Sequence, residues 1–382
     1  MKSQAHFGHF YQCLKKLKSI WIQVFLIALV IILLNMSVSV LTPYVGEIGV
    51  LQLKKDSMQD YEAEGNVEVS RRQVVKPEER QKQKVVFIWT TWRSGSTFLG
   101  ELIKRASDKS FYSYEPLQIF QIRVFDKTEN PNCDTTTAVS TVRDILSCNY
   151  TAHEKLLSYQ RHHGWYKRAN TYLMNNCKTK CADPTYVTEL CRETEVHVLK
   201  VLRLSLRWAR TYLEDKDLDF QILFLTRDPR AVLSSRQKVF WCTSPACIDP
   251  KLTCCHLADE LEEAAVLQND FPDRFKFLLY DEICLNVTKS LEDIMAFLNL
   301  PVHPLQIKLL EAKDTSQSKQ SVYKNSYLQA QLWRKSTSFK DVVLPVQESC
   351  RSSLEKLGLK TFSTEAEFLD LNVSTVERPW QL

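Results

Sequence analysis

The fold depends on one stretch, Val85-Val86-Phe87-Ile88-Trp89-Thr90-Thr91-Trp92-Arg93-Ser94-Gly95-Ser96-Thr97-Phe98-Leu99. Its first part is a short apolar run rich in β-branched and aromatic residues, which predicts a buried strand. Small hydroxyl residues and one glycine interrupt the run over residues 91–97. Apolar residues resume at helical spacing over residues 98–103, with Thr97 or Ser96 placed to cap the helix. A strand, a tight turn and a helix N-terminus converge on one point, so the stretch predicts an anion site.

The loop in this stretch differs from the nucleoside triphosphate cradle, which reads G-x-x-x-x-G-K-[ST]. The first glycine is missing, Ser96 stands where the lysine would follow Gly95, and Arg93 lies two residues before that glycine. The loop therefore predicts a phosphate site without the marks of a β,γ-phosphate bound with magnesium. A strand, turn and helix with no ligand would show the same pattern.

A second stretch repeats this arrangement later in the chain. Residues 219–226 predict another buried strand, and a helix follows in residues 231–236. Pro229 suits the first turn of that helix, where a missing N–H costs nothing. Arg227 ends the strand, and Ser235 lies two turns along the helix. Both side chains are expected to reach a ligand beyond the carboxyl ends of a parallel sheet.

Further strands and helices alternate along the chain. Strands are predicted at residues 196–202 and 275–280. Helices are predicted at residues 206–213 and at residues 290–298, where the second is amphipathic and begins with a capping box. Alternation of this kind predicts an α/β fold, an open and mainly parallel sheet flanked by helices, similar to that of P-loop NTPases.

The two motifs together resemble those of the Golgi carbohydrate sulfotransferases, and within them the galactose/N-acetylgalactosamine/N-acetylglucosamine 6-O-sulfotransferase family. The resemblance runs from about residue 85 to the C-terminal region, and includes residues 111–116 and 323–334. It implies transfer of a sulfuryl group from 3′-phosphoadenylyl sulfate (PAPS) to the 6-hydroxyl of a Gal, GalNAc or GlcNAc residue in a glycan or proteoglycan.

In this resemblance the first motif holds the 5′-phosphosulfate of PAPS and the second holds its 3′-phosphate. Arg93 and the neighbouring amides would neutralise the charge of the leaving phosphate, so Arg93 is a catalytic candidate and no metal is required. The implied donor-binding residues are Thr91, Trp92, Arg93, Ser94, Gly95, Ser96, Thr97, Arg227, Asp228, Pro229, Arg230, Ala231, Val232, Leu233, Ser234 and Ser235.

The acceptor hydroxyl also needs a base, and the resemblance places Glu115 beside it. The aromatic residues at 111–114 are expected to desolvate this carboxyl and raise its pKa. The alternative is a structural glutamate ahead of a turn proline. His197 is a weaker candidate, because a lone histidine in an apolar strand is usually part of the core. Lys200 and Arg203 would either attract an anionic glycan or form ion pairs.

The N-terminal part predicts a membrane anchor. Residues 1–19 carry lysines and no acid, and residues 20–41 form an uncharged, mainly apolar run. The lysines predict a cytoplasmic tail and hence a single-pass type II protein with its bulk in the lumen. The resemblance implies that the membrane is that of the Golgi. Residues 42–84 have the polar composition of a luminal stem, and residues 85–382 would form the luminal catalytic domain. A cleaved signal peptide is the alternative.

Eleven of the twelve cysteines follow the predicted anchor. In a luminal domain they predict disulfides, with at least one thiol left over and the pairing undetermined. The alternative is a zinc site at the second of two cysteine clusters, because His256 lies beside that cluster. The two clusters are Cys177, Cys181 and Cys191, and Cys242, Cys247, Cys254 and Cys255. Residues 133–191 lack clear periodicity and predict a disulfide-tied insertion that shapes the acceptor site.

Three glycosylation sequons begin at Asn149, Asn286 and Asn372, as a secretory-pathway domain would carry. The formal charge of +5 suits an anionic ligand, but no dense basic run with interleaved aromatics predicts nucleic-acid binding. The composition leaves open whether the chain forms a homo-oligomer.

Two other enzyme classes fit parts of the sequence. A type II Golgi glycosyltransferase would use an Asp-x-Asp motif to bind a metal, and Asp217-Leu218-Asp219 has that form but precedes its strand. A P-loop glycan kinase would need a lysine after Gly95 and an acid for magnesium. A lectin-like binding protein would not need the paired phosphate motifs.

Overall fold

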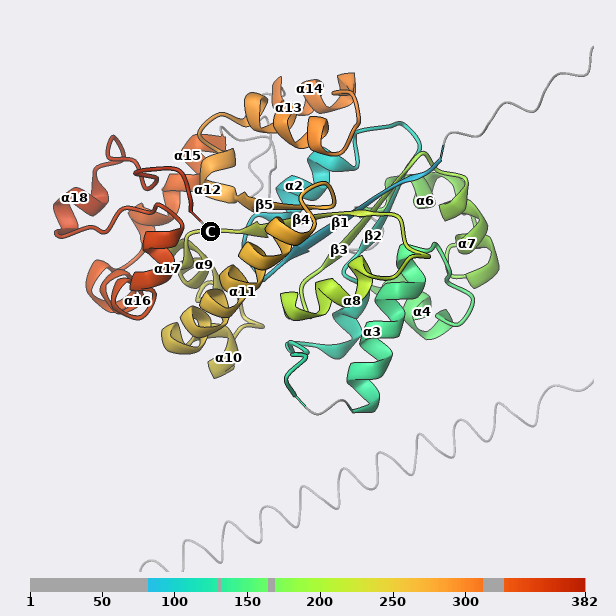
Figure 1. Cartoon of the computed structure of the whole chain (residues 1–382), viewed down its shortest axis with the longest axis horizontal. Coiled ribbons are helices and arrows are strands. Elements are labelled where there is room, and N and C mark those ends of the chain that lie inside the picture. Colours follow the sequence, from blue (N-terminus) through green and yellow to red (C-terminus); the bar gives the residue numbers. More distant parts are fainter. Residues whose placement is uncertain (1–81, 130–131, 164–168, 312–325, 382) are drawn as a thin grey trace, which may run out of the picture. The chain divides into compact units, whose positions relative to one another are not determined.

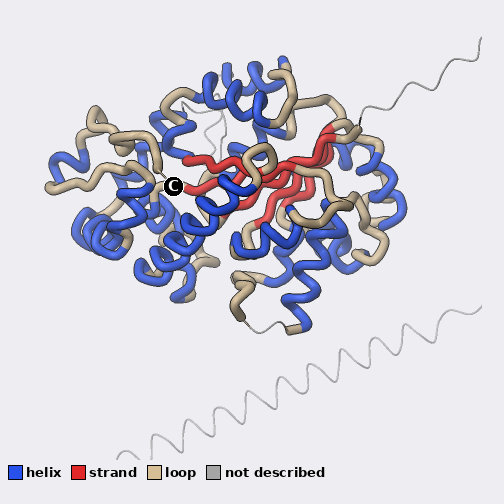
Figure 2. Tube along the Cα trace, viewed as in Figure 1, coloured by secondary structure: helices blue, strands red, loops and turns tan. Residues whose placement is uncertain are grey.

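The strand that leads into the first motif, β1 (Lys84–Thr90), lies in the centre of a five-stranded sheet. The strand order is β2-β3-β1-β4-β5 and every neighbouring pair is parallel, which confirms the predicted α/β sheet (Figures 1 and 2). The other strands are β2 (Ser110–Tyr114), β3 (Val196–Val201), β4 (Gln221–Thr226) and β5 (Phe275–Leu279). The computed structural model describes residues 82–129, 132–163, 169–311 and 326–381.

Apolar side chains cover both faces of the sheet. Phe87 and Trp89 of β1 lie in one buried cluster with residues of α3, α8 and α11, and Val86 and Ile88 lie in another with residues of α2 and α13. Figure 1 shows these two groups of helices on opposite sides of the strands. The bounds are α2 (Ser96–Ile103), α3 (Cys133–Leu146), α8 (Ala209–Leu213), α11 (Pro250–Asp270) and α13 (Val287–Phe297). Burial on both faces explains why the strands read as continuous apolar runs.

The topology brings the two motifs to one edge of the sheet. All five strands are parallel, so their carboxyl ends lie at the same edge. After β1 the chain builds β2 and β3 on one side of it, and then crosses to build β4 on the other side. Ligands bind in α/β sheets at such a reversal of strand order. The loops after β1 and β4 are therefore neighbours.

Two helix starts differ from those predicted. Gly95, in a left-handed conformation with φ of 91°, is the N-cap of α2, and neither Ser96 nor Thr97 caps it. The turn needs positive φ at that position, which glycine adopts without strain. Helix α13 begins at Val287, three residues before the predicted Ser290, because the side chain of Asn286 accepts a hydrogen bond from the Lys289 amide.

The described residues between 133 and 191 are mainly helical, although the sequence there shows no clear periodicity. They form α3 together with α4 (Glu154–His162), α6 (Thr171–Asn176) and α7 (Pro184–Arg192). Asn132, Asn170 and Asp183 cap three of these helices through their side chains. Helices α4, α6 and α7 are short, and these helices contribute residues to the buried cluster on one face of the sheet, so tertiary packing that is not visible in the sequence stabilises them.

Four disulfides join eight of the cysteines, namely Cys148–Cys191, Cys177–Cys181, Cys242–Cys247 and Cys254–Cys350. The second cysteine cluster thus pairs partly within itself and partly with the C-terminal region, which disfavours the zinc alternative. Among the described residues Cys133 and Cys255 are exposed free thiols, and Cys284 is a buried one.

The remaining helical segments connect the strands and form the C-terminal region. They are η1 (Pro116–Phe120), η2 (Leu206–Trp208), α9 (Pro229–Arg236), α10 (Pro245–Ile248), α12 (Tyr280–Ile283), α14 (Pro304–Glu311), α15 (Ser326–Gln331), η3 (Leu332–Ser336), the π-helical turn η4 (Phe339–Val343), α16 (Leu344–Ser349), α17 (Arg351–Lys356) and α18 (Glu365–Leu369).

The predicted tail, the predicted anchor and nearly all of the predicted stem fall within residues 1–81 and so lie outside the described residues. In the part of the chain that the structure describes, no helix has both the length and the apolar character needed to span a membrane.

Candidate active site

The loop after β1 is tightly built. Gly95 has φ of 91° and Arg93 has φ of 72°, so the backbone turns sharply at both residues. A Cβ at Gly95 would overlap the ring of Tyr280. Ser94 is fully buried and its hydroxyl has no hydrogen-bond partner among the described residues. A buried, unpaired hydroxyl in such a turn is consistent with a ligand that supplies the missing partner.

Gly95→Ala should therefore disrupt the loop. The alanine would need positive φ and would also displace the Tyr280 ring, so we expect a loss of roughly 1–3 kcal/mol in the free energy of unfolding. Denaturant unfolding of Gly95→Ala, and of the same substitution in a Tyr280→Ala background, separates the cost of positive φ from the cost of overlap with the ring. Tyr280→Ala removes a buried ring and is itself destabilising, so the effect of Gly95→Ala is measured in that background, where it should be smaller by the part that is due to overlap. A Gly95→Ala protein as stable as the wild type would contradict the geometry.

The loop after β4 is held by buried charges. Asp228 caps α9 by accepting from the Arg230 amide at 2.9 Å, and its carboxylate also pairs with the Arg230 guanidinium at 2.7 Å. Pro229 occupies the first turn, as predicted. Arg230 donates further to Gln347 Oε1 and to the Lys360 carbonyl, and Asp281 accepts from the Asp228 amide at 2.7 Å.

Several predicted donor-binding residues are thus part of the packing. Asp228 and Arg230 are fully buried with their charges paired inside the protein, and Ala231, Leu233 and Ser234 are buried in α9. These residues hold Arg227 and Ser235 in position. Of the whole motif, Arg227 and Ser235 carry the polar groups that remain only partly buried.

The two motifs meet through their functional side chains. Arg93 Nε donates to Ser235 Oγ at 2.8 Å, and Arg227 Nη1 donates to the Arg93 carbonyl at 3.4 Å. Arg227 also stacks on the Tyr280 ring, with 4.8 Å from Cζ to the ring centroid. Partial desolvation and the positive charge of Arg227 lower the pKa of Arg93. Two guanidinium groups that repel each other in this way form a site for an anion.

Glu115 directly follows β2, as the N-cap of η1, and is ion-paired. Its carboxylate is 3.0 Å from Lys200 Nζ and 3.1 Å from Arg203 Nη1, and 12% of its side chain is exposed. Burial by itself would raise the pKa of Glu115, but Lys200 and Arg203 outweigh it and hold that pKa below its ordinary value of 4.5. The predicted rise in pKa is wrong, because the cations come from β3 and the loop after it, far away in sequence. The ion pairs expected of Lys200 and Arg203 are present.

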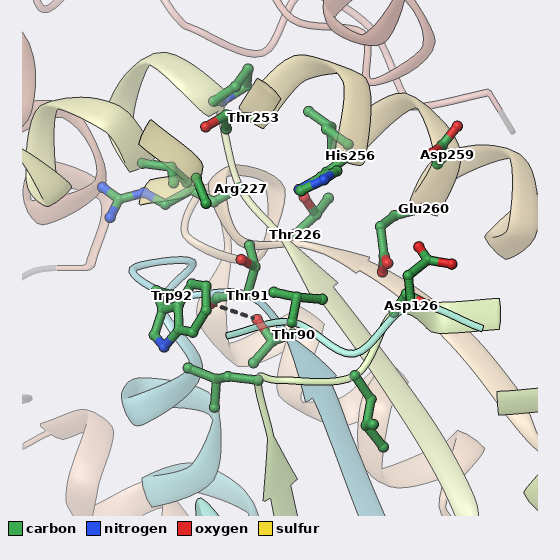
Figure 3. A pocket seen from close by; sticks show the side chains of 18 of the residues that line it. Thr90, Thr91, Trp92, Asp126, Thr226, Arg227, Thr253, His256, Asp259 and Glu260 are labelled. Atoms are coloured by element: carbon green, nitrogen blue, oxygen red, sulfur yellow. Dashed lines mark hydrogen bonds between the residues drawn. The ribbon is translucent and has the colours of Figure 1, made fainter. Parts of the chain in front are cut away.

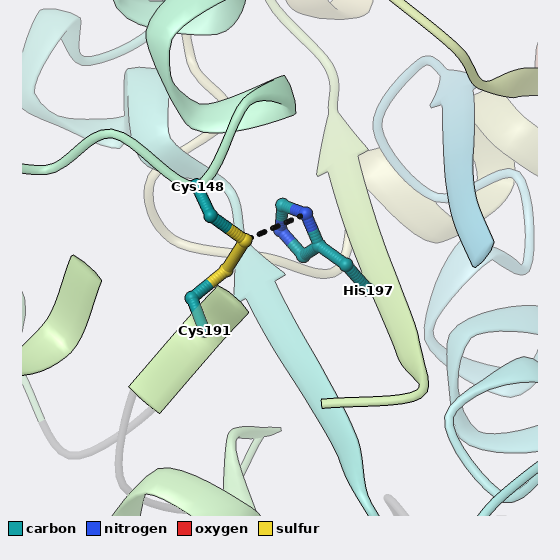
Figure 4. A group of neighbouring side chains, drawn as sticks. All are labelled: Cys148, Cys191 and His197. Carbon is teal, nitrogen blue, oxygen red and sulfur yellow. Dashed lines mark hydrogen bonds between the residues drawn. A yellow bond between two sulfur atoms is a disulfide. The ribbon is translucent and has the colours of Figure 1, made fainter. Parts of the chain in front are cut away.

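His197 is a core residue. It is fully buried in β3, its Nε2 lies 2.7 Å from Ser113 Oγ, and its Nδ1 lies 3.5 Å from Cys148 Sγ. Burial lowers the pKa of His197 to about 3, so the ring is neutral at physiological pH. Figure 4 shows it beside the Cys148–Cys191 disulfide, whose sulfur atoms are bonded to each other and are not thiolate ligands.

A cavity of about 350 Å³ opens beside the loops, at the carboxyl edge of the sheet. Thr91, Trp92 and Arg227 of the two motifs line it, together with α11 (Figure 3). No described residue between 133 and 191 does so, and the acceptor-shaping role predicted for that segment has no support there. Glu115 is not in the cavity wall either.

Sequence reasoning missed the contribution of α11. Thr253, His256 and Glu260 of this helix face the cavity. The signal was present at its N-terminus, where Asp249 caps the helix and Pro250 occupies its first position.

The residues that would support the rival enzymes are placed elsewhere. Asp219 precedes β4 and pairs with Lys82, so the Asp-x-Asp motif lies at the edge of the sheet opposite Arg227. The buried Asp228 carboxylate is engaged by Arg230 instead of being open to magnesium. Both arrangements disfavour the glycosyltransferase and the kinase.

Fold and site define an α/β protein in which two strand-end loops bring Arg93, Arg227 and Ser235 together at the carboxyl edge of the sheet. A family model described as "Sulfotransferase domain" matches residues 83–341, and the chain belongs to this sulfotransferase family. The chain is 25% identical to mouse carbohydrate sulfotransferase 1, over 76% of this chain and 83% of that protein. It is also 25% identical to mouse carbohydrate sulfotransferase 5, over 75% and 84%. The sulfotransferase domain from the Synechococcus PCC 7002 olefin synthase aligns with a TM-score of 0.41 and 17% identity, covering 74% of this chain and 98% of that one.

Proposed function

We propose that this sulfotransferase transfers the sulfuryl group of PAPS to the 6-hydroxyl of a Gal, GalNAc or GlcNAc residue in a glycan or proteoglycan. The observation that carries the proposal is the meeting of Arg93, Arg227 and Ser235, which come from two motifs 134 or more residues apart. Similarity to carbohydrate sulfotransferases 1 and 5 supports a carbohydrate acceptor.

In this proposal the loop after β1 receives the 5′-phosphosulfate. The amides of residues 94–97 and the N-terminus of α2 supply hydrogen-bond donors, and Arg93 neutralises the charge that develops on the leaving phosphate. Arg227 and Ser235 take the 3′-phosphate, which distinguishes PAPS from ATP. Because Arg93 already contacts Ser235, a donor that spans both loops would replace this contact with contacts to its own phosphates.

Glu115 is proposed as the base that accepts the proton of the sugar hydroxyl. Its lowered pKa keeps the carboxylate ionised at neutral pH, as a base must be, but also makes it a weaker base. The alternative is that Glu115 serves to hold Lys200 and Arg203. No metal has a part in the proposed step, and transfer in the presence of EDTA is the test of that statement.

Transfer of labelled sulfate from PAPS to a panel of desulfated glycans tests the proposed function directly. The expected product is a glycan that carries the labelled sulfate on the 6-hydroxyl of a Gal, GalNAc or GlcNAc residue. Transfer to no glycan, or transfer that depends on manganese and a nucleotide sugar, would overturn the proposal.

Arg227→Ala should mainly weaken donor binding. Loss of a charged hydrogen bond costs roughly 1.5–3 kcal/mol, which corresponds to about a 10- to 100-fold weaker affinity for 3′,5′-ADP. Calorimetric titration measures it, and Arg274→Ala provides a control because Arg274 donates to the Leu213 and Leu218 carbonyls near the start of β4. An unchanged affinity in Arg227→Ala would make the second motif structural.

We also propose that the enzyme is a type II protein of the Golgi membrane with a luminal catalytic domain. Support comes from the sequence before residue 82 and from the sequons at Asn149, Asn286 and Asn372, of which the last two asparagines are exposed. Protease treatment of sealed microsomes should leave the catalytic domain intact, and a glycosidase should change its mobility. Digestion without detergent would contradict this topology.

A further inference from the structure

Of the two donor loops, which follow β1 and β4, the first is linked to Glu115 through both oxygens of its carboxylate. Oε1 lies 3.0 Å from Lys200 Nζ, and Oε2 lies 3.1 Å from Arg203 Nη1. The Lys200 ammonium faces the Tyr114 ring, 3.9 Å from its centroid. The Arg203 guanidinium faces the ring of Trp92 in the donor loop, with 5.5 Å from Cζ to the centroid. Each cation is thus held between the carboxylate and an aromatic ring.

Tyr114 completes the first of these links. It is the last residue of β2 and lies opposite Lys200 in the parallel pairing of β2 with β3. Its hydroxyl is hydrogen-bonded to the side chains of Lys200 and of Thr97, which lies in the first turn of α2. An ammonium group can only donate, so the Tyr114 oxygen accepts from Lys200. Contacts therefore run from the carboxylate through Lys200 and Tyr114 to the loop proposed to hold the 5′-phosphosulfate.

The backbone at Glu115 adds to this constraint. Glu115 has φ of 44°, and Gln121 at the other end of η1 has φ of 58°. Arg203 bonds to both residues, through Nη1 to the carboxylate and through Nε to the Gln121 carbonyl at 2.6 Å. A left-handed conformation is costly at a residue other than glycine and persists where the surrounding contacts enforce it. The direction of the carboxylate is thus fixed by its backbone as well as by its ion pairs.

Lys200 is too deeply buried to reach a ligand. Only 1% of its side chain is exposed, against 12% for Glu115. A cation in this position acts through the groups that it contacts, which are the Glu115 carboxylate and Tyr114. Tyr114 is only partly buried, and Thr97 is exposed beside the N-terminus of α2. The Tyr114 hydroxyl therefore joins a buried ion pair to an exposed loop.

We infer that the Tyr114 hydroxyl is a positioning group for sulfuryl transfer, which holds Lys200, and through it the Glu115 carboxylate, at a fixed place relative to the donor loop. The inference rests on the proposed function and on Glu115 as its base. The base must lie within hydrogen-bonding reach of the acceptor hydroxyl, and that hydroxyl must lie in line with the sulfur. The donor loop positions the sulfur and the end of β2 positions the base, so a link between them sets this geometry.

Tyr114→Phe keeps the ring that Lys200 faces and removes the hydroxyl. At saturating PAPS, kcat should fall about tenfold or more, because a displacement of about 1 Å at the reacting groups costs up to 10²-fold in rate. KM for PAPS and the affinity for 3′,5′-ADP should stay within about twofold of wild type, since the hydroxyl acts on the base and not on the donor. An unchanged kcat in Tyr114→Phe would overturn the inference.

Tyr112→Phe is the matched control, because it makes the same change two residues earlier on β2. The Tyr112 hydroxyl is buried and has no hydrogen-bond partner among the described residues. Its removal should leave kcat within about twofold of wild type. Both variants are compared at a temperature at which circular dichroism shows them folded. An equal loss of kcat in the two variants would show that β2 responds to any lost hydroxyl, and would also overturn the inference.

A double-mutant cycle tests the link to the donor loop. Thr97→Val removes the other hydroxyl of the link from an exposed residue, where the fold does not depend on it. The kcat of Tyr114→Phe/Thr97→Val should lie within about twofold of that of Tyr114→Phe, because the second substitution removes a contact that is already lost. Losses that multiply would show that Tyr114 does not act through the donor loop.

Comparison with Glu115→Gln separates this inference from the proposed function. A low kcat in Glu115→Gln beside a wild-type kcat in Tyr114→Phe would overturn the inference and leave the base and the proposed function in place. A wild-type kcat in Glu115→Gln would overturn the base and the inference together, while transfer from PAPS to a glycan would still stand. Failure of the wild-type enzyme to sulfate any glycan would overturn the proposed function itself.

Discussion

Glu115→Gln should lower kcat by about 10²–10⁴, the usual contribution of general-base catalysis, while the affinity for 3′,5′-ADP is retained. Glutamine keeps the shape of the side chain and can accept from one of Lys200 and Arg203, which contact different carboxylate oxygens at 3.0 and 3.1 Å, but it cannot take up the acceptor's proton. Single-turnover transfer from PAPS gives the rate of the chemical step. A rate within about threefold of wild type would remove Glu115 from the mechanism.

A structural role for Glu115 predicts a different pattern. The carboxylate pairs with two nearly buried cations, so its loss would also lower the free energy of unfolding. Since the folded-state pKa is below 4.5, this stabilisation is present above that pH and is lost as pH falls through the lowered pKa. A variant that loses stability but keeps kcat would identify an ion-pair role alone.

The pH profile distinguishes the two roles further. With Glu115 as the base, the acid limb of kcat should lie below pH 4.5, where the carboxylate becomes protonated. Lys200→Met removes one of the two cations that lower this pKa, so it should move the acid limb to higher pH. An acid limb at the same pH in wild type and Lys200→Met would show that another group controls the rate.

Arg93→Ala should lower kcat by about 10²–10³, the cost of removing one donor that stabilises developing charge. The side chain is exposed and its contacts are with Ser235 and with the positive charge of Arg227, so removing it should leave the fold intact. The variant should therefore match the wild type in circular dichroism and thermal unfolding. Transfer from PAPS at saturating donor measures the loss.

Arg105→Ala is the matched control for this experiment. Arg105 follows α2, on the same connection as Arg93, and its guanidinium donates to Glu101 instead of facing the donor loops. It should transfer sulfate at nearly the wild-type rate. If Arg93→Ala also transfers sulfate near the wild-type rate, another group neutralises the charge on the leaving phosphate. Arg227 then becomes the candidate for that role.

Local patterns in the sequence were enough to predict the parallel α/β sheet and four of its five strands, but β2 (Ser110–Tyr114) was not predicted. β1 and β4 are continuous apolar runs because both faces of the sheet are covered, and such runs are visible without any tertiary contact. The start of α9 was also predictable, since Pro229 acts on the backbone within its own turn. The two motifs were sufficient to recognise the sulfotransferase family, which the match over residues 83–341 bears out.

The N-cap of α2 marks a limit of local reasoning. Ser96 and Thr97 are good N-cap residues, yet the structure places Gly95 at that position with φ of 91°, where a Cβ would overlap the ring of Tyr280. Tyr280 lies 185 positions away in the chain. The contact between Gly95 and the Tyr280 ring therefore could not be predicted from the residues around Gly95.

Only the tertiary structure decided how the site is charged. The Arg93–Ser235 contact joins residues 142 positions apart, and the cations that lower the pKa of Glu115 come from β3 and the loop after it. Each local pattern specifies the conformation of its own segment. A pKa or a ligand preference depends on distances between segments, which the packing of helices on the sheet determines.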